Sequence, residues 1–411
     1  MKVAFCGLLL PEEKGLTKRA KRRLPGISGH KVTSSLIDGI DANLAEPVTV
    51  FNIINTFNFP NFPDIVFKTE KWSHRAGVSD IHIGYINLFG IKYITQTYNL
   101  YKNLCKWKKQ NAREKCVVCV YNIHFPMLLA IYMLKRKYQD SVVICLSTGD
   151  LTGKYNSIPY RRPGIKEWLI WQMGKYIDKL AREFDCFVFA TKYMAAALGV
   201  EKKPWIVLEC TYSEPGYVHN TFQEKTENPT DKIIFYAGAL KATYGITHLL
   251  NAFSLIKDPH YQLWIAGGGT EVPLVEEYAR KDSRIKFLGY MSPEEVALRQ
   301  KESTVLINPR TTEYEYVKYS FGGKTMECLA SGKPYIAHRL PCDPPEYAEH
   351  IQYPDNDSDE ALAKKIVEIC EFSEEKREKI GANARLFILN EKNPTVMCKP
   401  VVDMWKQMLK E

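Results

Sequence analysis

The stretch YSFGGKTMECLASGKP, residues 319–334, has a glycine loop that leads into the predicted start of a helix. Small residues end that helix early at Ser331 and Gly332, and Pro334 precedes a short apolar strand. A glycine loop followed by a helix directs free backbone N–H groups and the positive end of the helix dipole at one place, where a phosphate can bind. The stretch therefore predicts an α/β domain with a phosphate site; a plain turn before a surface helix is the alternative.

Two charged side chains in the same stretch suit a ligand linked to a nucleotide. Lys324 adds a cation to the loop, and Glu327 follows about one helical turn later. A carboxylate accepts two hydrogen bonds at once, so Glu327 suits the two hydroxyls of a ribose. The rest of the predicted donor loop consists of Ser320, Phe321, Gly322 and Gly323.

This stretch resembles the nucleotide-sugar motif of family-four glycosyltransferases, which are retaining enzymes with the GT-B fold. Their pattern has a Glu, an aromatic-Gly loop and a second Glu eight residues after the first, then a small-residue helix end and Gly-x-Pro. The second Glu is Glu327 here, whereas Tyr319 stands in place of the first. The form S-F-x-x-K-x-x-E-x-L-A-S-G-K-P is similar to a branch common among bacterial capsule and surface-polysaccharide transferases.

An earlier stretch, IIFYAGALKATYG at 233–245, has a second strand, glycine and helix arrangement around Gly238. In the family that it resembles, this loop carries an Arg and a Lys that clamp the diphosphate, and Ala239 and Tyr244 occupy those positions here. A departing diphosphate needs compensating positive charge, so we expect other cations to replace the clamp; a weak donor site is the alternative. The candidates are Lys324, Lys241 and Arg310.

The segment IKFLGYM, residues 285–291, resembles the part of the family whose backbone pairs with the nucleotide base. The resemblance implies that Gly289, Tyr290 and Met291 make this contact here. A backbone contact places little demand on side-chain identity, so the base stays open.

The first half of the chain offers weaker candidates. The loop of residues 24–36 contains Gly26, Ser28 and Gly29, which permit close backbone approach to the acceptor or the leaving phosphate. Asp150 follows the strand VVICLS, and His124 follows the strand CVVCVYNI; ligands in open α/β sheets bind at such strand ends. We expect both side chains to have catalytic roles. The alternatives are a plain turn for the loop, a turn-capping role for Asp150 and a structural role for His124.

The chain alternates continuous apolar strands with helical patterns in two successive sets, which predicts two parallel sheets covered by helices on both faces. The expected architecture is α/β of the GT-B type, with two doubly wound Rossmann-like domains facing each other across a cleft. We expect an acceptor-side domain at 1–215, a nucleotide-sugar domain at 216–392 and a C-terminal helix at 393–411 that crosses back to the first domain. The polar stretch 213–231 is the expected linker.

The charge distribution and the cysteine content indicate where in the cell the protein acts and what it contacts. Residues 1–225 carry 32 Lys and Arg against 19 Asp and Glu, with basic clusters at 18–23 and 102–115. This charge favours binding to an anionic membrane surface that holds a lipid-linked acceptor. The alternative is a solvated basic face without a partner. No nucleic-acid recognition motif is visible in the sequence. The eleven cysteines lack paired spacing and are expected to be buried thiols, which favours the cytoplasm. Together with the basic charge, this predicts a cytoplasmic protein that is peripheral on the inner face of the plasma membrane.

The start MKVAFCGLLL is typical of a first strand rather than a signal peptide, and no apolar run reaches the roughly 20 residues of a membrane span. The aspartates of 354–359 are typical of a surface loop, so neither a metal nor a cofactor is expected.

The sequence thus predicts a metal-independent glycosyltransferase that moves a sugar from a nucleoside diphosphate sugar to a glycan or lipid-linked acceptor. Two other readings stay open. Ala239, Tyr244 and Tyr319 favour a catalytically weak sugar-nucleotide-binding subunit of a polysaccharide assembly, and a GT-B epimerase or phosphorylase is the other alternative.

Overall fold

The structure is a computed structural model that describes residues 1–9, 27–149, 151, 165–214 and 231–410. It divides into two compact units. We call Met1–Thr211 with Pro394–Glu411 unit 1, and Tyr212–Asn393 unit 2. Part of the expected linker, residues 215–230, lies outside the described residues.

Among its described residues, unit 1 has an eight-stranded sheet in the order β10-β9-β8-β7-β1-β2-β5-β4, parallel except for the antiparallel pair β4 and β5. The strands are β1 (Lys2–Gly7), β2 (Thr49–Asn52), β4 (Glu70–Trp72), β5 (Asp80–His82), β7 (Cys116–Tyr121), β8 (Val142–Thr148), β9 (Cys186–Phe189) and β10 (Trp205–Val207). A separate antiparallel pair joins β3 (Val66–Phe67) and β6 (Tyr85–Ile86).

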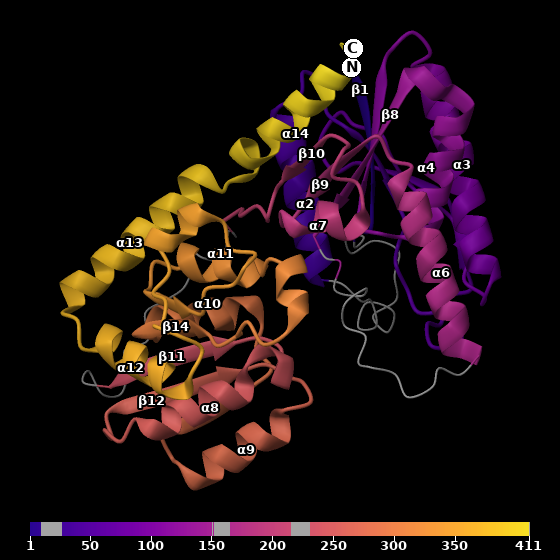
Figure 1. Ribbon diagram of the computed structural model, residues 1–411. Coiled ribbons are helices and arrows are strands. Elements are labelled where there is room, and N and C mark those ends of the chain that lie inside the picture. Colours follow the sequence, from indigo (N-terminus) through magenta and orange to yellow (C-terminus); the bar gives the residue numbers. More distant parts are fainter. Residues whose placement is uncertain (10–26, 150, 152–164, 215–230, 411) are drawn as a thin grey trace. The chain divides into compact units, whose positions relative to one another are not determined.

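The helices of unit 1 cover both faces of this sheet (Figure 1). They are α2 (Ile27–Ala42), α3 (Ile91–Gln110), α4 (Phe125–Tyr138), α6 (Ile165–Arg182), α7 (Tyr193–Leu198) and α14 (Pro394–Met408). Successive strand residues point to opposite faces, so Val3 and Phe5 pack in one core with Trp405 of α14, while Phe51 meets Trp107 of α3 edge-on at 6.4 Å. Burial on both faces explains the continuous apolar strands of the sequence.

The C-terminal helix α14 packs on α2, as predicted. Gly39 of α2 allows this approach, because a Cβ there would lie 2.3 Å from the carbonyl oxygen of Pro394. The side-chain amide of Asn43 donates to the carbonyl of Thr395 at 2.8 Å. Trp405 is fully buried and completes the core beside β1.

The described part of unit 2 has a five-stranded parallel sheet in the order β13-β12-β11-β14-β15. Its strands are β11 (Lys232–Ala237), β12 (Tyr261–Ala266), β13 (Ile285–Gly289), β14 (Val305–Asn308) and β15 (Tyr335–Ala337). Its helices are α8 (Ile246–Leu255), α9 (Val272–Lys281), α10 (Pro293–Glu302), α11 (Gly323–Ala330), α12 (Asp359–Cys370) and α13 (Glu374–Glu391). The two parallel sheets confirm the predicted pair of Rossmann-like folds.

All eleven cysteines lie in the described ranges and are free and buried, which confirms the expectation of buried thiols. Cys116 and Cys119 belong to strand β7 rather than to a metal site. No described helix is both long and apolar enough to cross a membrane.

Candidate active site

The candidate site lies where the strand order of unit 2 reverses. From the central strand β11, the chain first builds β12 and β13 on one side and then β14 and β15 on the other. In open α/β sheets, ligands bind beyond the carboxyl ends of the strands at this reversal. Gly238 follows β11 and Arg310 follows β14 closely, so the sheet itself brings two predicted donor-site residues to this edge.

Lys324 of α11 lies against Gly238. A Cβ at position 238 would be 1.7 Å from the Nζ atom of Lys324, so a side chain there would displace the ammonium group. The same Nζ lies 4.3 Å from the centre of the Tyr236 ring, a cation–π distance. Burial lowers the pKa of Lys324 to about 8. The ammonium group of Lys324 is therefore held against the loop after β11 with little solvation.

Arg310 is buried, with only 7% of its surface exposed. Its Nε and Nη2 atoms find no hydrogen-bond partner among the described residues. Its guanidinium lies over two aromatic rings, with its centre 4.6 Å from that of Tyr316 and 5.8 Å from that of Tyr244. Buried guanidinium nitrogens normally have partners, so these donors suit an anion.

The start of α11 provides the third feature of the site. Its N-cap residue Gly322 has extended backbone angles and makes no side-chain capping bond, and Phe321 packs on Tyr347 below it at 5.4 Å. The first N–H groups of a helix lack intrahelical partners and attract anions. Glu327, one turn further on, is exposed on the same short helix. Ser320 and Gly323 flank the cap, so the predicted donor loop is one local structure.

The helix that follows β11 also begins at this edge. Gly245 is the N-cap of α8 and has a positive φ of 79°. A Cβ there would lie 2.0 Å from the carbonyl oxygen of Pro309, so the loops after β11 and β14 approach each other only because this residue is glycine. Lys241 is exposed just before this turn.

A chain of ionisable side chains fixes the loop that follows Arg310. The Nε2 atoms of His248 and His338 are 2.8 Å apart, and Nδ1 of His338 lies 3.1 Å from Asp357. The other carboxylate oxygen of Asp357 accepts from the backbone N–H of Thr312 at 3.0 Å. Burial and the nearby charge of His248 lower the pKa of His338 to about 4, so its ring is neutral and can accept the hydrogen of His248. This chain borders a cavity of about 470 Å³ beside the start of α8.

The residues predicted to pair with the base lie at the end of β13. The carbonyl of Gly289 accepts from the N–H of Gly267 at 2.7 Å, which ties the β13 end to the loop after β12. Tyr290 is 83% exposed and Met291 is half-buried. The geometry leaves their role in base pairing a prediction.

The predicted residues of unit 1 are less defined. Gly26 and Asp150 lie outside the described residues, and Ser28 and Gly29 fall in the first turn of α2. His124 is the N-cap of α4, and its buried Nδ1 has no partner in the described part of the chain. Burial, helped by the charge of Lys92, lowers the pKa of His124 to about 4, so its ring is neutral near pH 7.

Sequence reasoning missed the residues that support Arg310. From sequence, Tyr244 stood out only because it replaces a lysine, whereas in the structure the rings of both Tyr244 and Tyr316 lie within cation–π distance of the guanidinium. Sequence reasoning also missed Asp343, whose pKa burial raises to about 6 and whose carboxylate accepts from the N–H of Leu340 at 2.9 Å. The only signal for the aromatic support was the tyrosine-rich stretch 314–319.

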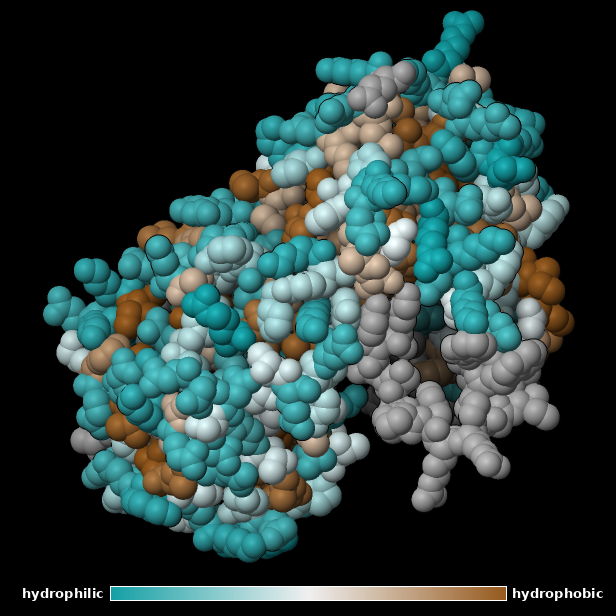
Figure 2. All heavy atoms as spheres, viewed as in Figure 1, coloured by the Kyte–Doolittle hydropathy of each residue, from teal (hydrophilic) through white to brown (hydrophobic). Residues whose placement is uncertain are grey.

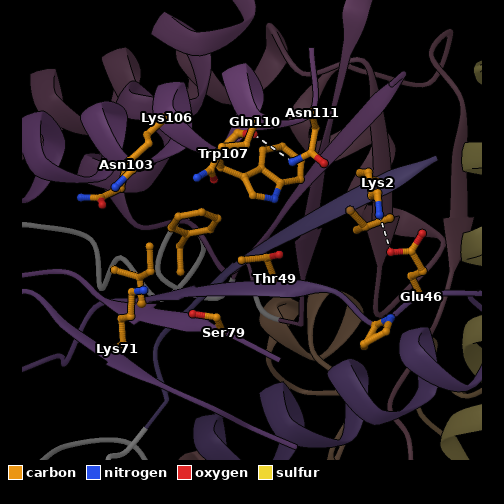
Figure 3. Close-up of a pocket in the computed structure, with 14 residues that line it drawn as sticks. Lys2, Glu46, Thr49, Lys71, Ser79, Asn103, Lys106, Trp107, Gln110 and Asn111 are labelled. Carbon is orange, nitrogen blue, oxygen red and sulfur yellow. Dashed lines mark hydrogen bonds and ion pairs between the residues drawn. The ribbon is translucent and has the colours of Figure 1, made fainter. Parts of the chain in front are cut away.

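A second cavity, of about 410 Å³, lies in unit 1 (Figure 3). Lys2 and Thr49, which line it, are the first residues of β1 and β2. The cavity therefore lies at the opposite edge of the sheet from the strand ends where α/β proteins bind their ligands. The described residues contain no group of three or more His, Cys, Asp or Glu side chains placed to hold a metal ion.

Comparisons with known proteins bear on the family and on the fold of the chain. Residues 218–387 match the model of the family described as glycosyl transferases group 1. No curated protein sequence matches the chain.

Solved structures share the fold over almost the whole chain. Sucrose-phosphate synthase from Thermosynechococcus elongatus is 17% identical, with a TM-score of 0.63 and coverage of 100% of this chain and 99% of that one. The lipopolysaccharide outer core galactosyltransferase WaaB, in its apo form, is 14% identical, with a TM-score of 0.63 and coverage of 99% and 100%. Anabaena HepE in complex with UDP is 13% identical, with a TM-score of 0.60 and coverage of 99% and 100%.

The match of residues 218–387 and the shared fold together identify a glycosyltransferase with the GT-B fold. The matched segment spans most of unit 2, and over that segment the chain is similar to the group 1 glycosyltransferases. The recognition of the family and of the enzyme class from sequence is thereby confirmed. The match does not single out the capsule branch.

Proposed function

We propose that this enzyme transfers a sugar, with retention of configuration, from a nucleoside diphosphate sugar to an acceptor hydroxyl in bacterial surface-polysaccharide synthesis. The segment 216–392 holds the donor, and 1–215 serves the acceptor. The group 1 match of unit 2 and the UDP complex of a structural neighbour support the donor class. The lipopolysaccharide galactosyltransferase among the neighbours supports the polysaccharide setting.

One observation carries the proposal. Two unpaired nitrogens of buried Arg310 and the poorly solvated ammonium of Lys324 stand at adjacent strand ends beside a helix N-terminus. Burying a charge without a partner costs several kcal/mol, and an anion removes that cost. A diphosphate carries its negative charge on two linked phosphate groups, so several hydrogen-bond donors can contact it at once. The missing Arg and Lys clamp is replaced, in this proposal, by Lys324 and Arg310, with Lys241 as an exposed third cation.

The roles of the cations in the transfer reaction follow from where negative charge develops in the transition state. As the bond between the sugar and the diphosphate breaks, negative charge increases on the leaving phosphate, and preorganised cations stabilise that charge more than they stabilise the ground state. Lys324 and Arg310 would do this, while Glu327 would hold the ribose and fix the donor's position. In the front-face path that the family resemblance implies, the leaving phosphate takes the proton of the acceptor hydroxyl, so no protein nucleophile is needed.

The acceptor side rests on fewer observations. His124 has a neutral ring with an unpaired buried Nδ1 within the described residues, which suits a hydrogen bond to a sugar hydroxyl rather than proton transfer from an imidazolium. Gly26, Ser28, Gly29 and Asp150 stay predicted acceptor and phosphate contacts. The buried free cysteines support a reducing compartment, so we place the enzyme in the cytoplasm, peripheral on the inner face of the plasma membrane, where a lipid-linked glycan could be reached.

A ligand screen followed by an activity assay tests the proposal. A nucleotide sugar present at about 100 times its dissociation constant should stabilise the protein by roughly 2.7 kcal/mol in thermal denaturation. The donor that stabilises most should then lose its sugar slowly to water when no acceptor is present, and NMR should show the released sugar first as the retained anomer.

The outcomes separate the alternatives. Binding without hydrolysis or transfer would favour the sugar-nucleotide-binding subunit, and interconversion of donors without acceptor would favour an epimerase. No stabilisation by any nucleoside diphosphate or its sugars would contradict the proposed donor site.

A further inference from the structure

Exposed hydrophobic side chains are concentrated in one part of unit 1. Of the nineteen large hydrophobic residues exposed in the described ranges, ten fall within residues 57–98. Single exposed hydrophobic residues are normal on a protein surface, but a cluster of this kind marks an interaction site. The ten are Phe57, Phe59, Ile65, Val66, Ile86, Phe89, Ile91, Tyr93, Ile94 and Tyr98.

Hydrogen bonds join these segments into one surface. Val66 of β3 pairs with Ile86 of β6, and the N–H of Ile86 donates to the hydroxyl of Thr95 in α3 at 3.2 Å. The N–H of Phe59 donates to the carbonyl of Asn87 at 3.1 Å. We call residues 56–67 and 84–98 the apolar lobe. Figure 2 shows hydrophobic side chains gathered at the right-hand edge of the molecule, over the lower end of α3.

The lobe has its own packed interior. Phe67 stacks on Tyr85 with ring centres 4.4 Å apart, and Phe62 is fully buried. Lys92 is buried and donates its ammonium to the carbonyl of Thr56 at 2.5 Å, which fixes the 56–59 segment to α3. The exposed side chains therefore project from an ordered base rather than from a loose loop, and Phe89 is 85% exposed.

Helix α3 continues the lobe with positive charge along the same face. Residues three, four or seven apart share a helix face. One exposed face therefore carries, in order along the helix, Ile91, Ile94, Tyr98, Lys102, Lys106 and Lys109. Residues 86–111 contain five lysines and neither Asp nor Glu. The face is apolar in its first half and basic in its second.

Neighbouring elements add positive charge at the basic end. Lys71 and Lys106 both line the 410 Å³ cavity, and Figure 3 shows Lys71 on the side facing α3. The last turn of α4 contains Arg136 and Lys137, and the ammonium of Lys137 lies 5.9 Å from the centre of the Tyr101 ring of α3. Lys135 of the same turn is paired with Asp185 at 3.0 Å and adds no free charge. Glu46, which also lines the cavity, is paired with Lys2.

We propose that the apolar lobe and the basic half of α3 form one docking surface for a bilayer containing anionic phospholipid. Phe89, Ile91 and Ile94 enter the interfacial region, while Lys102, Lys106 and Lys109 reach the phosphates. The proposal rests on the membrane setting given above, but not on the assignment of the donor site, because every residue in it belongs to unit 1.

The charge pattern favours a membrane, rather than a second copy of the chain, as the partner of this surface. A two-fold dimer through this face would bring equivalent patches of one protomer and its partner together, including lysines without carboxylates of α3 to pair with them. Like charges across an interface oppose association, whereas anionic headgroups pair with every lysine of the row. A surface without the lysines would suit a membrane and a second protomer equally well.

Co-sedimentation with vesicles tests the surface. The wild-type protein should bind vesicles of phosphatidylcholine mixed with phosphatidylglycerol, bind pure phosphatidylcholine far less, and be released by salt. The triple variant Lys102→Gln, Lys106→Gln, Lys109→Gln should lose about a hundredfold in apparent affinity, from about 1 kcal/mol per lysine. The double variant Phe89→Ser, Ile94→Ser should bind at least about tenfold more weakly even at low salt.

Matched controls come from unit 2. Leu386 is 56% exposed and Lys379 is exposed on the same helix, so Leu386→Ser and Lys379→Gln should bind vesicles like the wild type. All variants should keep the wild-type melting temperature and its shift with nucleotide sugar. Unchanged vesicle binding by both lobe variants would overturn the proposal. So would wild-type dimerisation that the same substitutions abolish, or no binding to anionic vesicles at low salt while the nucleotide sugar still binds.

Discussion

Donor binding by this enzyme should weaken with rising pH through Lys324. Burial lowers the pKa of its ammonium to about 8, so in the free protein about nine-tenths of the side chain is charged at pH 7 and about one-tenth at pH 9. A bound diphosphate favours the charged form and raises that pKa again. Only the charged fraction is competent to bind, so the apparent Kd should rise about tenfold from pH 7 to pH 9, or about 1.4 kcal/mol.

Isothermal titration at half-unit pH steps with the nucleotide sugar chosen by the thermal screen measures this slope. A nucleotide sugar lacks the terminal phosphate that titrates near neutrality, so the slope reports the protein. Lys324→Met should bind more weakly at pH 7 and lose the pH dependence. Lys333→Met is the control, because the pKa of Lys333 is also lowered by burial but this lysine follows the end of α11 away from the site. A flat wild-type profile, or a tenfold rise that persists in Lys324→Met, would refute the reasoning.

Three further substitutions or treatments test the rest of the site. Arg310→Met should weaken donor binding by about 1.5–3 kcal/mol in calorimetry without lowering the melting temperature, since it removes a buried charge with unpaired donors; a destabilised protein with normal donor affinity would assign Arg310 a purely structural role. Glu327→Ala should cost on the order of 1.5–3 kcal/mol of donor binding and little stability, and unchanged affinity would remove the ribose assignment. Excess EDTA should leave transfer largely intact, because lysine and arginine supply the charge; loss of activity that magnesium restores would show that a metal neutralises the diphosphate and would make Asp150 a candidate ligand.

The fold was predictable because its signal is local and repeated. Strands buried on both faces must be continuously apolar, and helices must separate them when they run parallel, so stretches such as KVAFCG and KIIFYA already specify the architecture. The crossing of the last helix followed from the family resemblance, and the packing of Trp405 beside β1 confirms it.

The site was predictable only where its parts are neighbours in sequence. The loop at 320–324 and Glu327 form one helix start, so their spacing shows their relation. Arg310 and Tyr244 are 66 positions apart and meet because β14 lies beside β11, which no local pattern reveals. The apolar lobe was missed for the same reason. A hydrophobic residue in 57–98 looks like a core residue until the tertiary structure leaves it on the surface.

The loss of the usual clamp and the position of Arg310 are best understood as one change. Tyr244 stands where the family resemblance places a lysine, directly before the glycine that starts α8. A lysine there would put a second cation beside Arg310 and raise the cost of burying the guanidinium. A tyrosine instead offers a ring to the guanidinium, and Tyr316 offers the other, held in place because its hydroxyl donates to the carbonyl of Thr243 at 2.7 Å. In the proposed site, the positive charge thus stays at the same edge of the sheet but comes from the end of β14 instead of the loop before α8, so the absence of the clamp is compatible with an active enzyme.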